Sequence, residues 1–162
     1  MPFDDFTLET YRKPKFHLSR GAHFERSEGV CVLEAAIARA GYPHRRVTDA
    51  QEMPREFSRV LGAYAMALND ALPDNLRTPL LEPYTRRLFG TGSDIGIEGK
   101  RWTFIWEAIF RRILPLEPEE KVLFIDLVGE IERCRHPRKW ELAVEILDEA
   151  MTIGKQARRD RH

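Results

Sequence analysis

The feature that most constrains the fold of this chain is a run of large apolar side chains with helical spacing in residues 100–113. Its members are Trp102, Ile105, Trp106, Ile109, Phe110 and Ile113. Residues three and four apart share one face of an α-helix, so the run predicts an amphipathic helix that Pro115 ends. Because such a helix must bury its apolar face against other elements, the run favours a helical domain.

A second stretch, residues 118–132, is apolar on most sides of the expected helix. Its apolar residues are Val122, Leu123, Phe124, Ile125, Leu127, Val128 and Ile131. A helix that is apolar nearly all round is typically buried. We therefore expect this helix to be central in the fold, with the 100–113 helix packed on it through Trp102, Ile105, Trp106 and Ile109.

Shorter apolar stripes predict further helices, each introduced by a residue that suits a helix start. These starts are Ser27, Pro54, Asp74 and Pro137, and the expected ends include Gly41, Phe89 and Gly154. Pro79 and Pro83 are expected to break the third of these helices in two. The sequence thus predicts an all-α fold: a single compact bundle of five to six helices in one domain over residues 1–162.

Residues 1–26 form an irregular N-terminal arm with too many large apolar residues for a disordered segment. We expect the arm to dock on the protein's own core, on a second copy or on a partner. The tail, residues 155–162, is basic and expected to fray. The candidate interaction residues of the arm are Phe3, Phe6, Phe16 and Leu18.

The composition excludes several classes of protein. The 162 residues include 26 Lys and Arg and 26 Asp and Glu, so no overall basic field exists for gripping nucleic acid. The two cysteines suggest no disulfide framework. The start of the chain does not read as a signal peptide, and the apolar runs are far too short to cross a membrane. We expect a cytoplasmic protein.

The glycine-rich stretch from Gly90 to Lys100 resembles a phosphate-binding loop only superficially. A P-loop needs a glycine where Asp94 stands and a Ser or Thr where Arg101 stands, and no strand precedes this stretch. Nucleotide binding is not expected, and the stretch is interpreted as a mobile connection between helices. At most, Ser93, Lys100 and Arg101 at the start of the next helix hold an adventitious anion.

Metal and acid–base sites are equally poorly supported. Cys134 and His136 lack the paired spacing that zinc sites show, so no metal is expected. Asp126 and Glu130 lie on the largely apolar 118–132 helix, where one of them could be partly buried and serve as a general acid or base. The ordinary interpretation is an exposed pair, or an ion pair with Arg111, Arg112 or Arg133.

Cys31 is the one candidate nucleophile. It lies in the first turn of a predicted helix, where the dipole lowers a thiol pKa, and Glu34 with His17, His23 or His44 would complete a catalytic set. Its apolar neighbours favour simple core packing instead. We therefore expect no catalytic residue and no cofactor.

Arginine-rich clusters recur along the chain, and the cluster of Arg135, Arg138 and Lys139 is the candidate surface for nucleic acid or an acidic protein. Acidic residues, among them Glu132 and Glu141, flank it. Strong nucleic-acid binding is therefore not expected.

Part of the chain, residues 28–91, resembles a family of small uncharacterised bacterial and phage proteins. The resemblance rests on Cys31-Val-Leu-Glu-Ala35, on Asn69-Asp70 and on Arg87-Leu-Phe-Gly-Thr91. It implies that Cys31, Glu34, Asn69 and Asp70 lie together, with Glu34 or Asp70 meeting Arg87. The further cysteines of those proteins are missing here.

These observations together favour a small non-enzymatic protein-interaction or regulatory module of bacterial or phage origin, whose partner is another protein or a second copy. A nucleic-acid-binding protein using the arginine clusters is the first alternative. A small enzyme centred on Cys31, or on Asp126 and Glu130, is the second.

Overall fold

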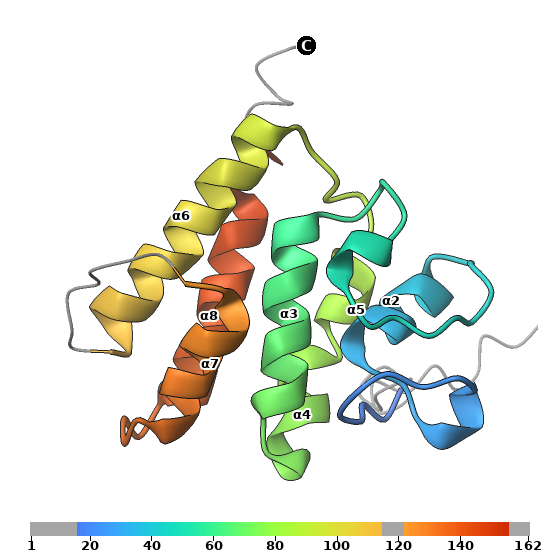
Figure 1. Cartoon of the computed structure of the whole chain (residues 1–162), viewed down its shortest axis with the longest axis horizontal. Helices are drawn as coiled ribbons and strands as arrows, with labels where there is room; N and C mark the ends of the chain where they lie inside the picture. Colours follow the sequence, from blue (N-terminus) through green and yellow to red (C-terminus); the bar gives the residue numbers. More distant parts are fainter. Residues whose placement is uncertain (1–15, 115–121, 156–162) are drawn as a thin grey trace, which may run out of the picture.

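A computed structural model describes residues 16–114 and 122–155 and confirms an all-α fold, with seven α-helices and no strand in those ranges (Figure 1). The helices are α2 (Val32–Arg39), α3 (Arg59–Ala71), α4 (Asp74–Leu81), α5 (Tyr84–Arg87), α6 (Ile95–Arg112), α7 (Phe124–Arg133) and α8 (Lys139–Thr152). Two short 3₁₀ turns, η1 (Arg26–Glu28) and η2 (Ala50–Glu52), flank α2. The described chain has one helix more than the five or six expected.

The centre of the fold is α3, which contacts α2, α4, α6, α7 and α8. In Figure 1 it stands between α6, α7 and α8 on one side and α2 and α5 on the other. Tyr64 on α3 is fully buried, and its hydroxyl donates to the carbonyl of Ala143 on α8 at 2.7 Å. The predicted central position of the 118–132 helix is therefore wrong. Its helical part, α7, lies against α3 and α6 and leaves Ile125 67% exposed.

The reason for this difference is where α7 begins. Leu123 is the N-cap of α7, so Val122 and Leu123 precede the helix and do not widen its apolar face. Phe124, Leu127, Val128 and Ile131 are buried on one side.

The predicted packing of α6 on the 118–132 helix is observed in part, because α6 contacts α7 through Trp102 but packs more extensively against α3 and α8. Ile105, Trp106 and Ile109 are buried, and the ring of Trp102 lies 4.2 Å from the ring of Phe124 on α7. The same helix also packs along α8.

Several helix starts differ from the expected ones because other side chains cap them. Cys31, and not Ser27, is the N-cap of α2, since Gly29 at φ 125° separates it from η1. Ser58, and not Pro54, caps α3. The third predicted helix is divided into α4 and α5, as Pro83 led us to expect, although Pro79 is accommodated within α4.

The described part of the N-terminal arm docks on the protein's own core. Phe16 and Leu18 are buried, and the Leu18 amide donates to the Thr78 hydroxyl at 2.9 Å. These two residues therefore follow the first of the three expected ways of docking, on the protein's own core. Phe3 and Phe6, like most of the basic tail, lie outside the described residues.

The glycine-rich stretch is held in place rather than being a mobile connection. The Gly92 amide donates to the Glu56 carbonyl at 2.9 Å, and a Cβ at Gly92 would lie 2.1 Å from the Arg55 carbonyl oxygen. Thr91 accepts from the Ser58 amide at 3.1 Å. Asp94 caps α6 by accepting from the Ile97 amide at 3.0 Å, so its carboxylate occupies the helix start where an anion was considered.

None of the described helices combines the length and the apolar composition that crossing a membrane requires.

Candidate functional site

The structure brings together four of the five residues that the family resemblance grouped. Cys31, Glu34, Asn69 and Asp70 lie where the N-terminal segment meets α2 and α3. The Asn69 side chain accepts from the Val32 amide at 3.1 Å and donates to the Ser19 carbonyl at 2.9 Å. Asp70 accepts from the Gly21 amide at 2.9 Å. These contacts join chain segments to one another.

Glu34 is the centre of this cluster, because its carboxylate is fully buried and accepts three backbone hydrogen bonds beside the His23 ring. One oxygen accepts from the amides of His23 at 2.7 Å and Val47 at 3.3 Å. The other accepts from the Cys31 amide at 3.0 Å and lies 2.9 Å from Nδ1 of His23, which donates when it carries the proton. A buried carboxylate surrounded by donors in this way is a structural anchor with no open face for a substrate.

Arg87 does not join this cluster, so the expected contact with Glu34 or Asp70 is wrong. It forms an ion pair with Asp148 on α8 and lies over the Tyr84 ring at 5.0 Å. The α5 turn directs its side chain toward α8, away from the N-terminal segment.

Cys31 is buried, with 1% of its surface exposed, and its Sγ accepts from the Glu34 amide at 3.5 Å. Burial, and then the nearby Glu34 carboxylate, raise the pKa of the Cys31 thiol to about 12. The pKa-lowering effect expected from the helix start is thus outweighed, and the thiol stays protonated at neutral pH. This arrangement is unsuited to a nucleophile.

We expect Ellman's reagent to modify only one thiol in the native protein. Cys134 is partly exposed and should react, whereas Cys31 should react only after unfolding in urea. The Cys134→Ser variant should then show no rapidly reacting thiol when native and one when unfolded. Rapid modification of Cys31 in that native variant would contradict the structure and restore the cysteine-enzyme alternative.

The acid–base alternative also loses its geometric basis. Asp126 and Glu130 are both exposed on α7, and Glu130 forms an ion pair with Arg133. The ordinary interpretation, an exposed pair with an ion pair to Arg133, is confirmed, and the alternative of a partly buried carboxylate is not.

The basic cluster is partly used within the molecule. The Lys139 ammonium donates to the carbonyls of Glu132 at 2.6 Å and Cys134 at 3.0 Å, at the C-terminal end of α7. Arg138 pairs with Glu145 at 3.2 Å, while Arg135 is exposed. Across residues 16–114 and 122–155, no three His, Cys, Asp or Glu residues are grouped so that they could hold a metal ion.

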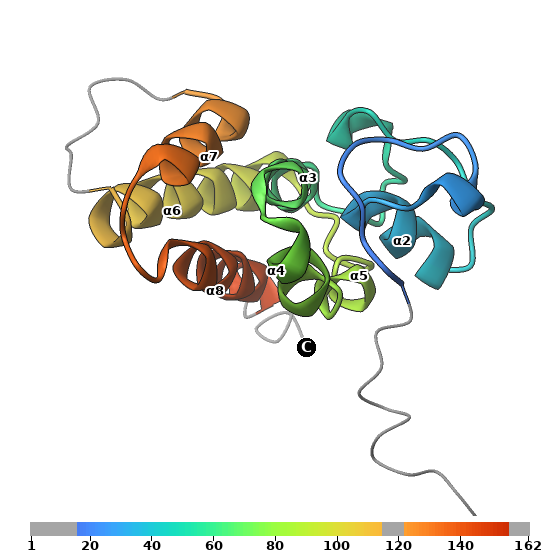
Figure 2. The same cartoon turned by 90° about the horizontal axis from the view of Figure 1, so that it is seen from below.

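A candidate binding surface is a groove of about 570 Å³ where α4 and α5 meet α8. Figure 2 shows α8 running past these two short helices. The apolar lining consists of Pro79, Leu80, Pro83, Tyr84 and Val144. We call this surface the α8 groove.

One wall of the α8 groove is acidic. Glu141, Glu145 and Glu149 are exposed at intervals of four residues along α8, and Asp148 lies beside them. The hydrogen bond from Arg87 lowers the pKa of Asp148, so this carboxylate is charged at neutral pH. Three of these four carboxylates form ion pairs: Glu145 with Arg138, Asp148 with Arg87 and Glu149 with Arg112. The wall is therefore lined with carboxylates, but its net charge is small until a ligand replaces these arginines.

The sequence reasoning missed this groove. The four-residue spacing of the glutamates was visible in the sequence, but the apolar lining comes mainly from residues 79–84, far from α8 along the chain. Only the packing of α4 and α5 beside α8 joins the two halves.

No protein-family model, curated protein or solved structure matches this chain. The resemblance to bacterial and phage proteins therefore remains a prediction.

Proposed function

We propose that this protein is a non-catalytic interaction module that binds a basic amphipathic helix of another protein in the α8 groove. The observation that carries the proposal is the pairing of an apolar lining with an acidic wall in one elongated surface. An amphipathic helix places apolar residues in such a groove and basic residues along its rim.

The dimensions of the groove support this kind of ligand. Glu141 and Glu149 are eight residues apart, so the acidic wall extends about 12 Å along α8. A partner helix of two to three turns matches that length, with leucine-sized side chains against Leu80 and Val144.

A ligand can replace the arginines that pair with the carboxylates of the acidic wall. Glu145 forms a direct ion pair with Arg138 at 3.2 Å, and both side chains are more than half exposed to solvent. Such exposed pairs contribute little to stability, so basic side chains of a ligand can replace Arg138 at small cost. Glu141 has no ion-pair partner among the described residues.

The test uses a labelled amphipathic peptide of about 14 leucine and lysine residues, long enough for the full groove. Fluorescence anisotropy should show binding that weakens with salt and that is lost when serine replaces the leucines of the peptide. The double variant Glu141→Lys/Glu145→Lys should weaken binding by a factor of about ten or more.

The matched control is Glu107→Lys/Glu130→Lys, which changes the net charge equally on the outer faces of α6 and α7. It should bind the peptide nearly as well as the wild type. Equal losses in the two double variants would show mere charge attraction and overturn the proposal. Tighter binding to duplex DNA than to the peptide would favour the nucleic-acid alternative instead.

A further inference from the structure

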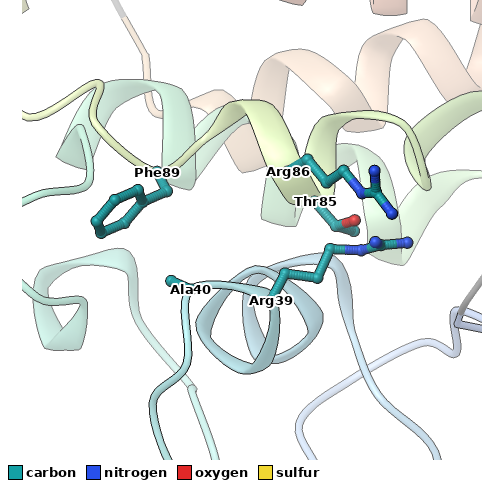
Figure 3. Close-up of a pocket in the computed structure, with 5 residues that line it drawn as sticks. All are labelled: Arg39, Ala40, Thr85, Arg86 and Phe89. Atoms are coloured by element: carbon teal, nitrogen blue, oxygen red, sulfur yellow. The ribbon is translucent and has the colours of Figure 1, made fainter.

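A second, smaller pocket lies between the end of α2 and α5, on the other side of α5 from the acidic wall. It has a volume of about 240 Å³ and is lined by Arg39, Ala40, Thr85, Arg86 and Phe89. Figure 3 shows the side chains of Arg39 and Arg86 extending in the same direction, with Thr85 between them and Phe89 at the far end. The pocket therefore has a cationic half and an apolar half.

The Arg39 side chain is held in place by its neighbours, but one of its hydrogen-bond donors has no acceptor. Its side chain is 7% exposed, forms an ion pair with Glu82 and lies over the Phe16 ring at 5.2 Å. The Nε of Arg39 is buried and has no hydrogen-bond partner among the described residues. A buried donor without an acceptor costs the folded state free energy. Because Nε is out of reach of a ligand, an anion in the pocket would accept from the outer N–H groups of the guanidinium that Glu82 leaves free to donate.

Arg86 supplies the second cation. It is exposed, and its guanidinium has no hydrogen-bond or ion-pair partner in the part of the chain that the structure describes. The hydroxyl of Thr85 already donates to the Glu82 carbonyl at 2.7 Å, so the two arginines provide the donors for a ligand. With the Glu82 carboxylate counted, the local charge is +1, from two arginines and one glutamate.

Phe89 gives the other half of the pocket a fixed apolar wall. Its ring is 47% exposed and meets the Phe57 ring edge to face, with 5.6 Å between the ring centroids. Because the aromatic pair holds the ring, a ligand can pack against it without ordering a mobile side chain.

We infer that this pocket binds a small monoanionic carboxylate that carries an apolar group, with the carboxylate at Arg39 and Arg86 and the apolar group at Phe89. Arginine recognises carboxylates through paired N–H donors, and one negative charge matches the local charge of +1. The volume is below the roughly 300 Å³ at which drug-sized ligand pockets begin. The ligand is therefore a small acid or the terminal carboxylate of a peptide.

The experiment is an NMR titration of the full ¹⁵N-labelled chain with phenylacetate, and with acetate and inorganic phosphate for comparison. Phenylacetate should shift the amides of Ala40, Thr85 and Phe89 with a dissociation constant on the order of 1 mM. Acetate and phosphate should each bind at least about tenfold more weakly. A dipeptide that ends in phenylalanine distinguishes a chain terminus from a free acid by binding more tightly than phenylacetate.

The variant Arg86→Ala should weaken phenylacetate binding about tenfold without affecting the fold, because Arg86 makes no contact that the fold needs. Arg55→Ala, at a 94% exposed arginine outside the pocket, should bind as the wild type does. The inference is overturned if phenylacetate shifts none of these amides, if Arg86→Ala binds normally, or if phosphate binds as tightly as phenylacetate.

Discussion

Replacing Glu34 with alanine should lower the free energy of unfolding by about 3–5 kcal/mol, because breaking a buried charged network leaves its partners unpaired. The amides of His23, Cys31 and Val47 would remain buried or partly buried without the carboxylate that accepts from them. Urea unfolding followed by tryptophan fluorescence measures the loss. A domain of this size is stable by roughly 5–15 kcal/mol, so the variant should unfold at a much lower urea concentration.

Two further variants separate this effect from a general loss of packing. Glu34→Gln keeps the shape but replaces one acceptor oxygen with a donor, and it should cost roughly 2 kcal/mol. Glu107→Ala, at a half-exposed carboxylate on α6, should change the free energy of unfolding by less than about 0.5 kcal/mol. If Glu34→Ala behaved like Glu107→Ala, the three backbone hydrogen bonds to Glu34 would not exist as described.

Hydrogen exchange gives a local measure of the same prediction. The amides of Cys31 and Val47 should exchange faster in Glu34→Gln than in the wild type. Amides in the middle of α6 should lose only as much protection as the fall in global stability accounts for. This pattern would locate the loss at the junction of α2 and the N-terminal segment.

The helices could be predicted from the sequence because their positions depend on local spacing. Ile105 and Ile109 are four residues apart, and both are buried where the stripe placed them. The position of α7 could not be predicted in this way. The apolar character of Val122 and Leu123 is local information, whereas the start of the helix and the side that faces α3 depend on tertiary packing.

The candidate sites were harder to predict than the helices. The grouping of Glu34 with Asn69 followed from the family resemblance, but the acceptors and donors around them are mostly backbone groups, which leave no mark in a sequence. Arg39 and Arg86 lie 47 positions apart and meet only because α5 packs on α2. For Phe16 the sequence left the choice open, since an apolar residue in an irregular segment is equally suited to a partner and to the protein's own core, and only the structure shows it in the core.

Arg101 illustrates how two adjacent cations can have different roles. In the sequence, Lys100 and Arg101 are equivalent charges near a helix start. In the structure Lys100 is exposed, whereas the Arg101 side chain is 4% exposed. The Arg101 guanidinium donates to the carbonyl of Thr91 at 2.7 Å and to that of Ile153 at 2.9 Å, and Glu98 lies 3.5 Å away. This one side chain joins the glycine-rich loop, α6 and the end of α8.

We therefore expect Arg101→Met to lower the free energy of unfolding by roughly 3 kcal/mol, because two carbonyls lose a donor and the partly buried Glu98 carboxylate loses its ion-pair partner. Lys100→Met removes the same charge from a neighbouring exposed position and should change stability by less than about 0.5 kcal/mol. Urea unfolding of both variants makes the comparison. Equal stabilities would mean that Arg101 acts only as a surface charge, and the loop would then lack its main link to the end of α8.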